Sequence, residues 1–129
     1  MTAFDIAQLV TRLALAAVFL VMGALHFVPG PARGMAAMIP PALRRPGVPA
    51  PPVLVAVTGA CEVAGGIGLL LPPTRVAAAI CLAVFLIAVF PANAYAARHP
   101  DRFGAFGTPL LPRAVLQLLL IALCVFCAL

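Results

Sequence analysis

Four long apolar stretches dominate the chain, and they cover residues 6–27, 53–71, 76–95 and 110–129. Each holds roughly 20 residues, and a helix of that length, at about 1.5 Å per residue, crosses a hydrocarbon core about 30 Å thick. Alanine and leucine predominate, and apolar positions do not alternate with polar ones, which argues against transmembrane strands. The pattern predicts an all-α membrane protein in which residues 1–129 form one antiparallel bundle of four transmembrane helices.

Proline marks the boundaries between these stretches. Eight of the 14 prolines lie in the first connection, residues 28–52. An apolar segment, residues 34–40, lies within that connection, between Arg33 and the Arg44–Arg45 pair. Two interpretations stay open: an interfacial or re-entrant segment that covers the mouth of the bundle, or an ordinary proline-rich loop.

The composition supports the membrane assignment. Hydrophobic residues make up 65% of the chain and charged residues 9%, which excludes a water-soluble globule and a disordered chain. The net charge of +5 comes from arginines that lie mainly in the connections. That distribution indicates membrane topology and contact with lipid headgroups, so we expect the lipid bilayer as a partner and no nucleic acid.

The arginines also predict an orientation. Five of them (Arg33, Arg44, Arg45, Arg98 and Arg102) lie in the first and third connections, whereas Arg75 alone lies in the second. Positively charged loops stay in the cytoplasm. We therefore expect connections 28–52 and 96–109 in the cytoplasm and both termini outside.

Several polar side chains lie within the predicted spans, where a polar group is costly and usually faces the bundle interior. Arg12, Phe19 and His26 recur at heptad spacing and share one helix face. The face that holds Glu62 also holds small residues, which permit close helix approach. The polar side chains are Arg12, His26, Glu62, Asn93, Arg113 and Gln117.

These residues allow more than one interpretation. Arg12 and Glu62 differ in predicted depth by roughly 5 Å, which makes them a candidate buried ion pair. The candidate ligand-binding residues form a polar path from one mouth to the bundle centre: His26, Glu62, Asn93, Arg113 and Gln117. The same residues would also serve as a proton site, as ties between helices or as a partner interface, and the sequence leaves these alternatives open.

Metal and thiol chemistry have weaker signals. Two histidines without a carboxylate cluster predict no metal site. Cys124 and Cys127 form a C-x-x-C pattern, but they lie in an apolar helix, where cysteine is more often a small hydrophobic residue than a redox group. No intrinsic cofactor motif is present.

Short segments along nearly the whole chain carry a resemblance to a known family. They are Arg12-Leu-Ala-Leu, Gly23-Ala-Leu-His26-Phe27, Met38-Ile-Pro40, residues 58–69, Phe90-Pro-Ala-Asn93, and Arg113 with Gln117. In this order they resemble the DoxX-like family of small four-helix bacterial membrane proteins.

The resemblance implies a multi-pass protein of the bacterial inner membrane that acts as a redox-associated accessory or quinone-interacting subunit. It implies a quinone or lipid bound in the bundle and a redox-protein partner subunit, and not an enzyme that acts alone. Two alternatives stay open: an enzyme similar to the four-helix EXPERA sterol isomerases, in which Glu62 shuttles protons on a lipophilic substrate, and a structural assembly partner. Homo-oligomer formation also stays open.

Overall fold

The computed structural model describes residues 1–103 and 108–129, and its regular elements are all helices. Four of them are long and apolar enough to cross a membrane: α1 (Ala3–Leu25), α3 (Pro51–Leu70), α4 (Arg75–Arg98) and α6 (Leu110–Ala128). Shorter elements lie in the connections, namely α2 (Pro29–Ala37), the 3-10 helix η1 (Pro41–Leu43) and α5 (Pro100–Phe103). The structure confirms the predicted all-α bundle of a multi-pass membrane protein.

Local sequence signals account for most helix boundaries. At the start of α1, the Thr2 hydroxyl accepts a hydrogen bond from the Asp5 amide and the Asp5 carboxylate accepts one from the Thr2 amide, which is a capping box. Proline occupies the first helical position of α2 and of α3, where a missing amide proton costs nothing. The predicted span ends agree with the structure to within about three residues, the usual uncertainty of helix boundaries.

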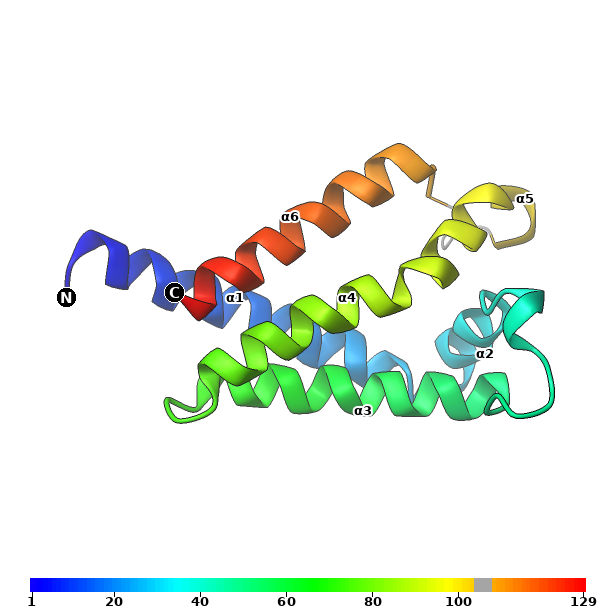
Figure 1. The fold of residues 1–129 in the computed structure, drawn as a ribbon, viewed down its shortest axis with the longest axis horizontal. Coiled ribbons are helices and arrows are strands. Elements are labelled where there is room, and N and C mark those ends of the chain that lie inside the picture. Colours follow the sequence, from blue (N-terminus) through cyan, green and yellow to red (C-terminus); the bar gives the residue numbers. More distant parts are fainter. Residues whose placement is uncertain (104–107) are drawn as a thin grey trace.

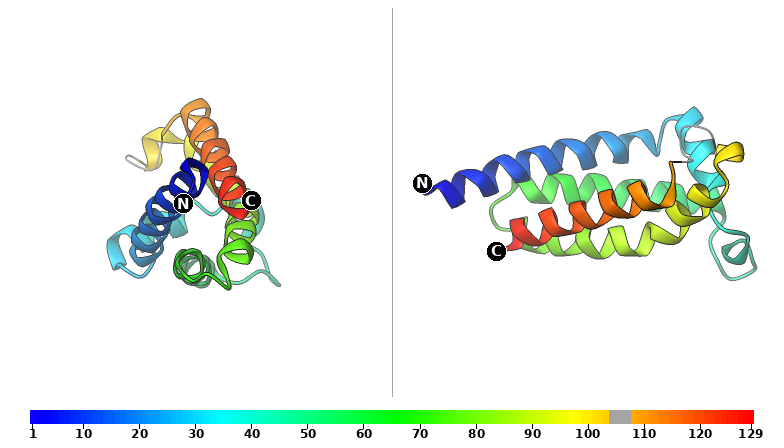
Figure 2. Two further views of the ribbon diagram at one scale, coloured as in Figure 1. Left: turned by 90° about the vertical axis from the view of Figure 1, so that its left-hand side faces the viewer. Right: turned by 90° about the horizontal axis from the view of Figure 1, so that it is seen from above.

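The long helices are arranged as two arms. α1 packs along α3, which we name the first arm, and α4 packs along α6, which we name the second arm. The arms meet at the end of the bundle that holds both termini and the α3–α4 turn, and they diverge toward the opposite end (Figures 1 and 2). We refer to the first as the packed end and to the second as the hollow end.

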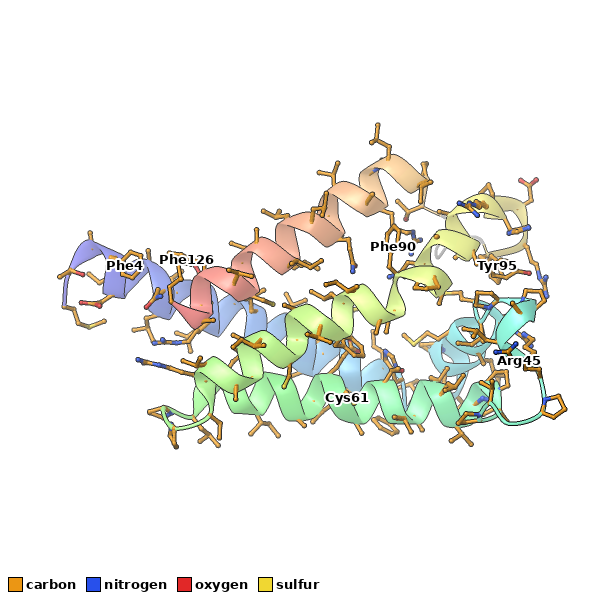
Figure 3. The ribbon with its side chains drawn as sticks, in the orientation of Figure 1. Phe4, Arg45, Cys61, Phe90, Tyr95 and Phe126 are labelled. Atoms are coloured by element: carbon orange, nitrogen blue, oxygen red, sulfur yellow. The ribbon has the colours of Figure 1, made fainter. Side chains whose placement is uncertain are left out.

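The hydrophobic core lies at the packed end. Leu15 of α1, Leu69 of α3, Leu82 of α4 and Cys124 of α6 are all almost fully buried in it. Between the arms, Phe4 packs edge-on against Phe126 with ring centroids 5.4 Å apart (Figure 3). Each long helix therefore contributes at least one fully buried side chain to the same core.

Small residues set the spacing of the helices. A Cβ atom added at Gly59 would lie 2.4 Å from Cβ of His26, and one added at Gly65 would lie 2.4 Å from Cδ2 of Leu82. Only glycine permits contacts this close, which is how helices associate in lipid, where no hydrophobic force drives them together. α3 therefore presents two glycines to α1, Gly59 and Gly66, and two to α4, Gly65 and Gly68.

The first connection folds over the hollow end. α2 packs against α3, and Met38 at its end forms a second buried cluster with Ala96 of α4 and Phe103 of α5. The guanidinium of Arg44 donates hydrogen bonds to the carbonyls of Ala36 and Ile39, and these bonds cap the end of α2. The segment therefore lies over the bundle mouth, and its interfacial or re-entrant character stays a prediction.

Candidate functional site

A cavity of about 410 Å³ lies between the two arms at the hollow end. Its wall is mostly apolar and includes side chains of α1, α2, α3, α4 and α6. Cavities that hold small molecules or cofactors typically measure about 300–1,000 Å³ and combine an apolar wall with a few polar groups. This cavity has both properties.

The five candidate ligand-binding residues all line this one cavity. His26 and Glu62 lie on the first arm, and Asn93, Arg113 and Gln117 lie on the second. The structure therefore brings together residues that are up to 91 positions apart in the sequence, from His26 to Gln117. Their binding of a ligand stays a prediction.

The first polar group comprises His26, Thr58 and Glu62, which we name the histidine set. His26 Nδ1 lies 2.8 Å from the carbonyl oxygen of Val55 and 3.1 Å from Oγ1 of Thr58. Because a carbonyl oxygen only accepts hydrogen bonds, Nδ1 must carry a proton and donate it. The Thr58 hydroxyl donates to the carbonyl of Leu54, 2.9 Å away, so its oxygen remains able to accept.

The other ring nitrogen of His26 faces the carboxylate of Glu62. Nε2 lies 2.7 Å from Oε2, and within the described residues this oxygen accepts no hydrogen bond from any other group. With Nδ1 already protonated, the contact requires one proton between Nε2 and Oε2, on either atom. The histidine set thus holds a proton next to the cavity, since both residues line it.

The backbone explains the position of His26. The residue caps the C-terminus of α1, and its Cβ lies directly over Gly59 of α3. The turn between Gly59 and Glu62 places the carboxylate on the same face of α3. Glu62 is 8% exposed, so the bundle buries the carboxylate almost completely.

The second polar group comprises Asn93, Arg113 and Gln117, which we name the arginine set. Arg113 Nη1 donates to Oδ1 of Asn93, 3.0 Å away, and Nε donates to the carbonyl of Thr108, 3.3 Å away. Gln117 Nε2 donates to the carbonyl of Leu86 on α4. The bonds to Asn93 and to the carbonyl of Leu86 join α6 to α4, so they hold the second arm together.

Pro91 lies inside α4, between the two positions where α6 makes these bonds. Proline lacks an amide proton and therefore leaves the carbonyl of Ile87 without its usual helical partner. Pro91 itself lines the cavity. The helical hydrogen-bond pattern of α4 is thus interrupted at the depth of the cavity, where the arms have separated.

The expected ion pair between Arg12 and Glu62 is not the one that forms. Within the described residues, the ion-pair partner of Glu62 is His26. Gly23 packs directly against Glu62, and Arg12 lies about three turns before Gly23, or about 16 Å along α1. The expectation assumed that the spans end at equal depths, whereas the register set by the glycine contacts places Arg12 level with the far end of α3.

Sequence reasoning missed Thr58 and Gln8. Thr58 lies one turn before Glu62 on the same face of α3, and this spacing was sufficient to include it. Gln8 is buried at the packed end, where Nε2 donates to the carbonyl of Phe126, 2.8 Å away. Its position near the start of α1 carried no signal that it crosses to the other terminal helix.

The four cysteines do not line the cavity. Cys124 and Cys127 are free, buried thiols in the core of the packed end, and Cys61 and Cys81 are free and exposed on the outer helix faces. Within the described residues, no three histidine, cysteine or acidic side chains gather as metal ligands do. Among the described residues, the polar side chains that line the cavity are therefore those of the histidine set and the arginine set.

Comparison with known proteins places the chain in a family without assigning an activity. No curated protein and no solved structure matches it. One family model, described as a domain of unknown function (DUF8561), matches residues 15–128. The matched range contains the cavity and both polar sets. The chain therefore belongs to the DUF8561 family.

Proposed function

We propose that the protein binds a quinone in the cavity between its arms and acts as a redox-associated accessory subunit of the bacterial inner membrane. The observation that carries the proposal is the cavity itself, an apolar chamber within a membrane bundle that has one polar set on each arm. The resemblance to the DoxX-like family supports the same ligand class.

The polar sets suit the ends of a quinone head. A quinone ring carries two carbonyl oxygens on opposite sides, and each accepts hydrogen bonds. On the second arm, one N–H group of the Gln117 amide bonds the Leu86 carbonyl, and the amide carries a second N–H group that can donate to a ligand. The Arg113 guanidinium lines the cavity beside it, and the His26–Glu62 pair holds a proton on the first arm. Between them the wall is apolar, including Phe85 and Val89, and matches the ring faces and substituents.

We infer an accessory role because the polar sets can bind a quinone but contain no group that donates electrons. The polar sets bind, orient and supply a proton, but electron transfer to a bound quinone requires a separate donor. We propose a redox-protein partner subunit as that donor. The bilayer is the other partner, and homo-oligomer formation stays open.

The binding test uses the whole protein purified in mild detergent. Native mass spectrometry and organic extraction should show a co-purifying quinone, and added decylubiquinone should bind to protein stripped of lipid. Binding of neither an endogenous quinone nor decylubiquinone would overturn the proposal.

Two buried glutamines provide a matched pair of variants. Gln117 and Gln8 both donate to a backbone carbonyl of another helix, but only Gln117 lines the cavity. Gln117→Leu should weaken decylubiquinone binding by about tenfold, the factor expected for one lost hydrogen bond to a buried ligand. Gln8→Leu should leave it unchanged, and equal effects of the two would argue against the cavity as the site.

The His26–Glu62 pair favours a second candidate function. A buried carboxylate that shares a proton with histidine is a suitable acid or base for moving a double bond in a lipophilic substrate. An unsaturated polycyclic lipid in the extract, instead of a quinone, would favour this enzyme over the accessory subunit. An empty cavity in a stable complex with another protein would favour a structural assembly partner.

The orientation is a separate proposal, with both termini outside and connections 28–52 and 96–109 in the cytoplasm. It rests on the five arginines in those connections against Arg75 in the second. Single cysteines at positions 45 and 75, in a background without native cysteines, test it in intact cells. A membrane-impermeant maleimide should label position 75, and labelling of position 45 instead would reverse the orientation.

A further inference from the structure

The cavity has two lateral sides, because it lies between two diverging arms. One side lies between α3 and α4, which also pack against each other. Met35, Met38 and Ile39 line the cavity from the first connection, and Met38 is buried against Ala96 and Phe103. The connection thus bridges from α3 to the second arm across the bundle mouth.

The other side lies between α1 and α6. These helices meet at the packed end, where Phe4 contacts Phe126 and Gln8 donates to the carbonyl of Phe126. Toward the hollow end they diverge, as Figure 1 and the left view of Figure 2 show. No cluster comparable to that around Met38 links α1 to α6 there among the residues that the structure describes.

Three side chains on the side between α1 and α6 line the cavity and are also exposed on the outer surface. Val18 and Met22 of α1 and Leu116 of α6 all line the cavity. Their exposed fractions are nevertheless 44%, 41% and 56%. Side chains that contact an internal space and remain this exposed lie at the rim of an opening. Ala88 of α4 also lines the cavity and is exposed, so the experiment below compares label there with label at these three residues.

The rim lies at the depth of the hydrocarbon. Val18 precedes the end of α1 by about two turns, and Leu116 follows the start of α6 by slightly less, so both lie roughly 10 Å from the hollow end of their helices. A leaflet of the hydrocarbon core is about 15 Å thick. The rim side chains are apolar, so the opening faces acyl chains.

We propose that the cavity opens laterally into one leaflet between α1 and α6, and that the tail of the bound molecule lies in this opening while its head contacts the polar sets. The inference rests on the proposed function and specifies its ligand class: an amphiphile with a small polar ring and a single apolar tail, taken up from the bilayer. A polar molecule without a tail would leave the rim uncovered.

The test maps the tail directly. Decylubiquinone with a diazirine at the end of its tail is photolysed with the whole protein in lipid nanodiscs, and the labelled residues are identified by mass spectrometry. Label that excess decylubiquinone suppresses should concentrate on α1 around Val18 and Met22 and on α6 around Leu116. Label that is not suppressed reports general contact with the bilayer and is subtracted.

Tryptophan variants provide matched controls. Val18→Trp with Leu116→Trp should narrow the opening and lower the suppressible label by about tenfold, the factor expected for two lost methylene contacts. Val21→Trp with Leu118→Trp places the same bulk on exposed positions of the same helices that do not line the cavity. The control protein should carry as much suppressible label as the wild type. A loss of label in the first pair alone then reports a blocked opening and not a misfolded protein.

The outcomes distinguish the two proposals. Suppressible label on Leu54 and Ala88, at the border of α3 and α4, or on α2, would overturn the lateral opening while leaving quinone binding intact. Equal loss in both tryptophan pairs would also overturn it. An absence of suppressible label anywhere would overturn quinone binding and the opening together.

Discussion

The packed end and the hollow end of the same bundle are built from similar apolar helices, yet one is solid and the other encloses a cavity. At the packed end, Leu82 fits over Gly65, and Leu69 and Cys124 are almost fully buried. At the hollow end, the helices diverge and polar sets take the place of interlocking apolar side chains. Because lipid does not drive helices together, they stay in contact only where their side chains interlock or form hydrogen bonds.

The hydrogen bonds show how the arms relate. Gln8 joins α1 to α6 and therefore links the two arms at the packed end. At the hollow end, His26 with Glu62 joins α1 to α3, and Gln117 with the carbonyl of Leu86 joins α6 to α4. Each of these two bonds lies within one arm and does not tie the two arms together. The polar side chains that form them also line the cavity between the arms.

The largest expected effect comes from weakening the packed end. Leu82→Ala should lower the free energy of unfolding by about 2–5 kcal/mol, because it removes a fully buried side chain and leaves a void over Gly65. Leu54→Ala, at a half-buried position on the cavity wall, should cost about 1 kcal/mol or less. Reversible unfolding in mixed detergent and dodecyl sulfate, followed by circular dichroism, measures both, and equal losses would contradict the contrast between the ends.

The next effect concerns the partner of Glu62. In a double-mutant cycle, His26→Leu and Glu62→Leu should show a coupling energy of about 1–3 kcal/mol, since each removes the other's buried partner. Arg12→Leu and Glu62→Leu should be additive to within about 0.5 kcal/mol, because the residues are far apart along the bundle. A coupling energy above about 1 kcal/mol between Arg12→Leu and Glu62→Leu would instead support the Arg12–Glu62 ion pair that the sequence predicted.

A comparable effect is expected at Gly59, the glycine under His26. Gly59→Ala should cost about 1–3 kcal/mol, because the added methyl group would overlap Cβ of His26 and force the helices apart. Gly30→Ala, in α2, meets no atom within 4 Å, and should change stability by about 1 kcal/mol or less in the stabilising direction. The same unfolding assay compares them, and a harmless Gly59→Ala would show that α1 and α3 are not in close contact there.

The smallest effect separates stability from binding. Gln8→Leu and Gln117→Leu should each cost about 0.6 kcal/mol, the average for a side-chain hydrogen bond between transmembrane helices. Thermal unfolding monitored by size-exclusion chromatography would detect the loss. A cost of several kcal/mol for Gln117→Leu alone would assign that residue to the structure of the second arm and not to ligand contact.

The four membrane helices followed from the sequence because length and hydropathy are local properties. A run of roughly 20 apolar residues has to form a helix in lipid, since no water satisfies its backbone groups. The same cost argument identified the interior polar side chains, and the structure places His26, Glu62, Asn93, Arg113 and Gln117 around one cavity.

Tertiary structure decided how those residues pair and where the space between them lies. Sequence spacing gives the face of each helix but not the register of one helix against another, so Glu62 was assigned to Arg12 and lies against His26. The register depends on how glycines such as Gly59 fit opposite side chains of α1, and the cavity depends on where four helices diverge. The helix register and the position of the cavity both depend on contacts between segments that are far apart in the sequence. The sequence of one helix does not determine those contacts.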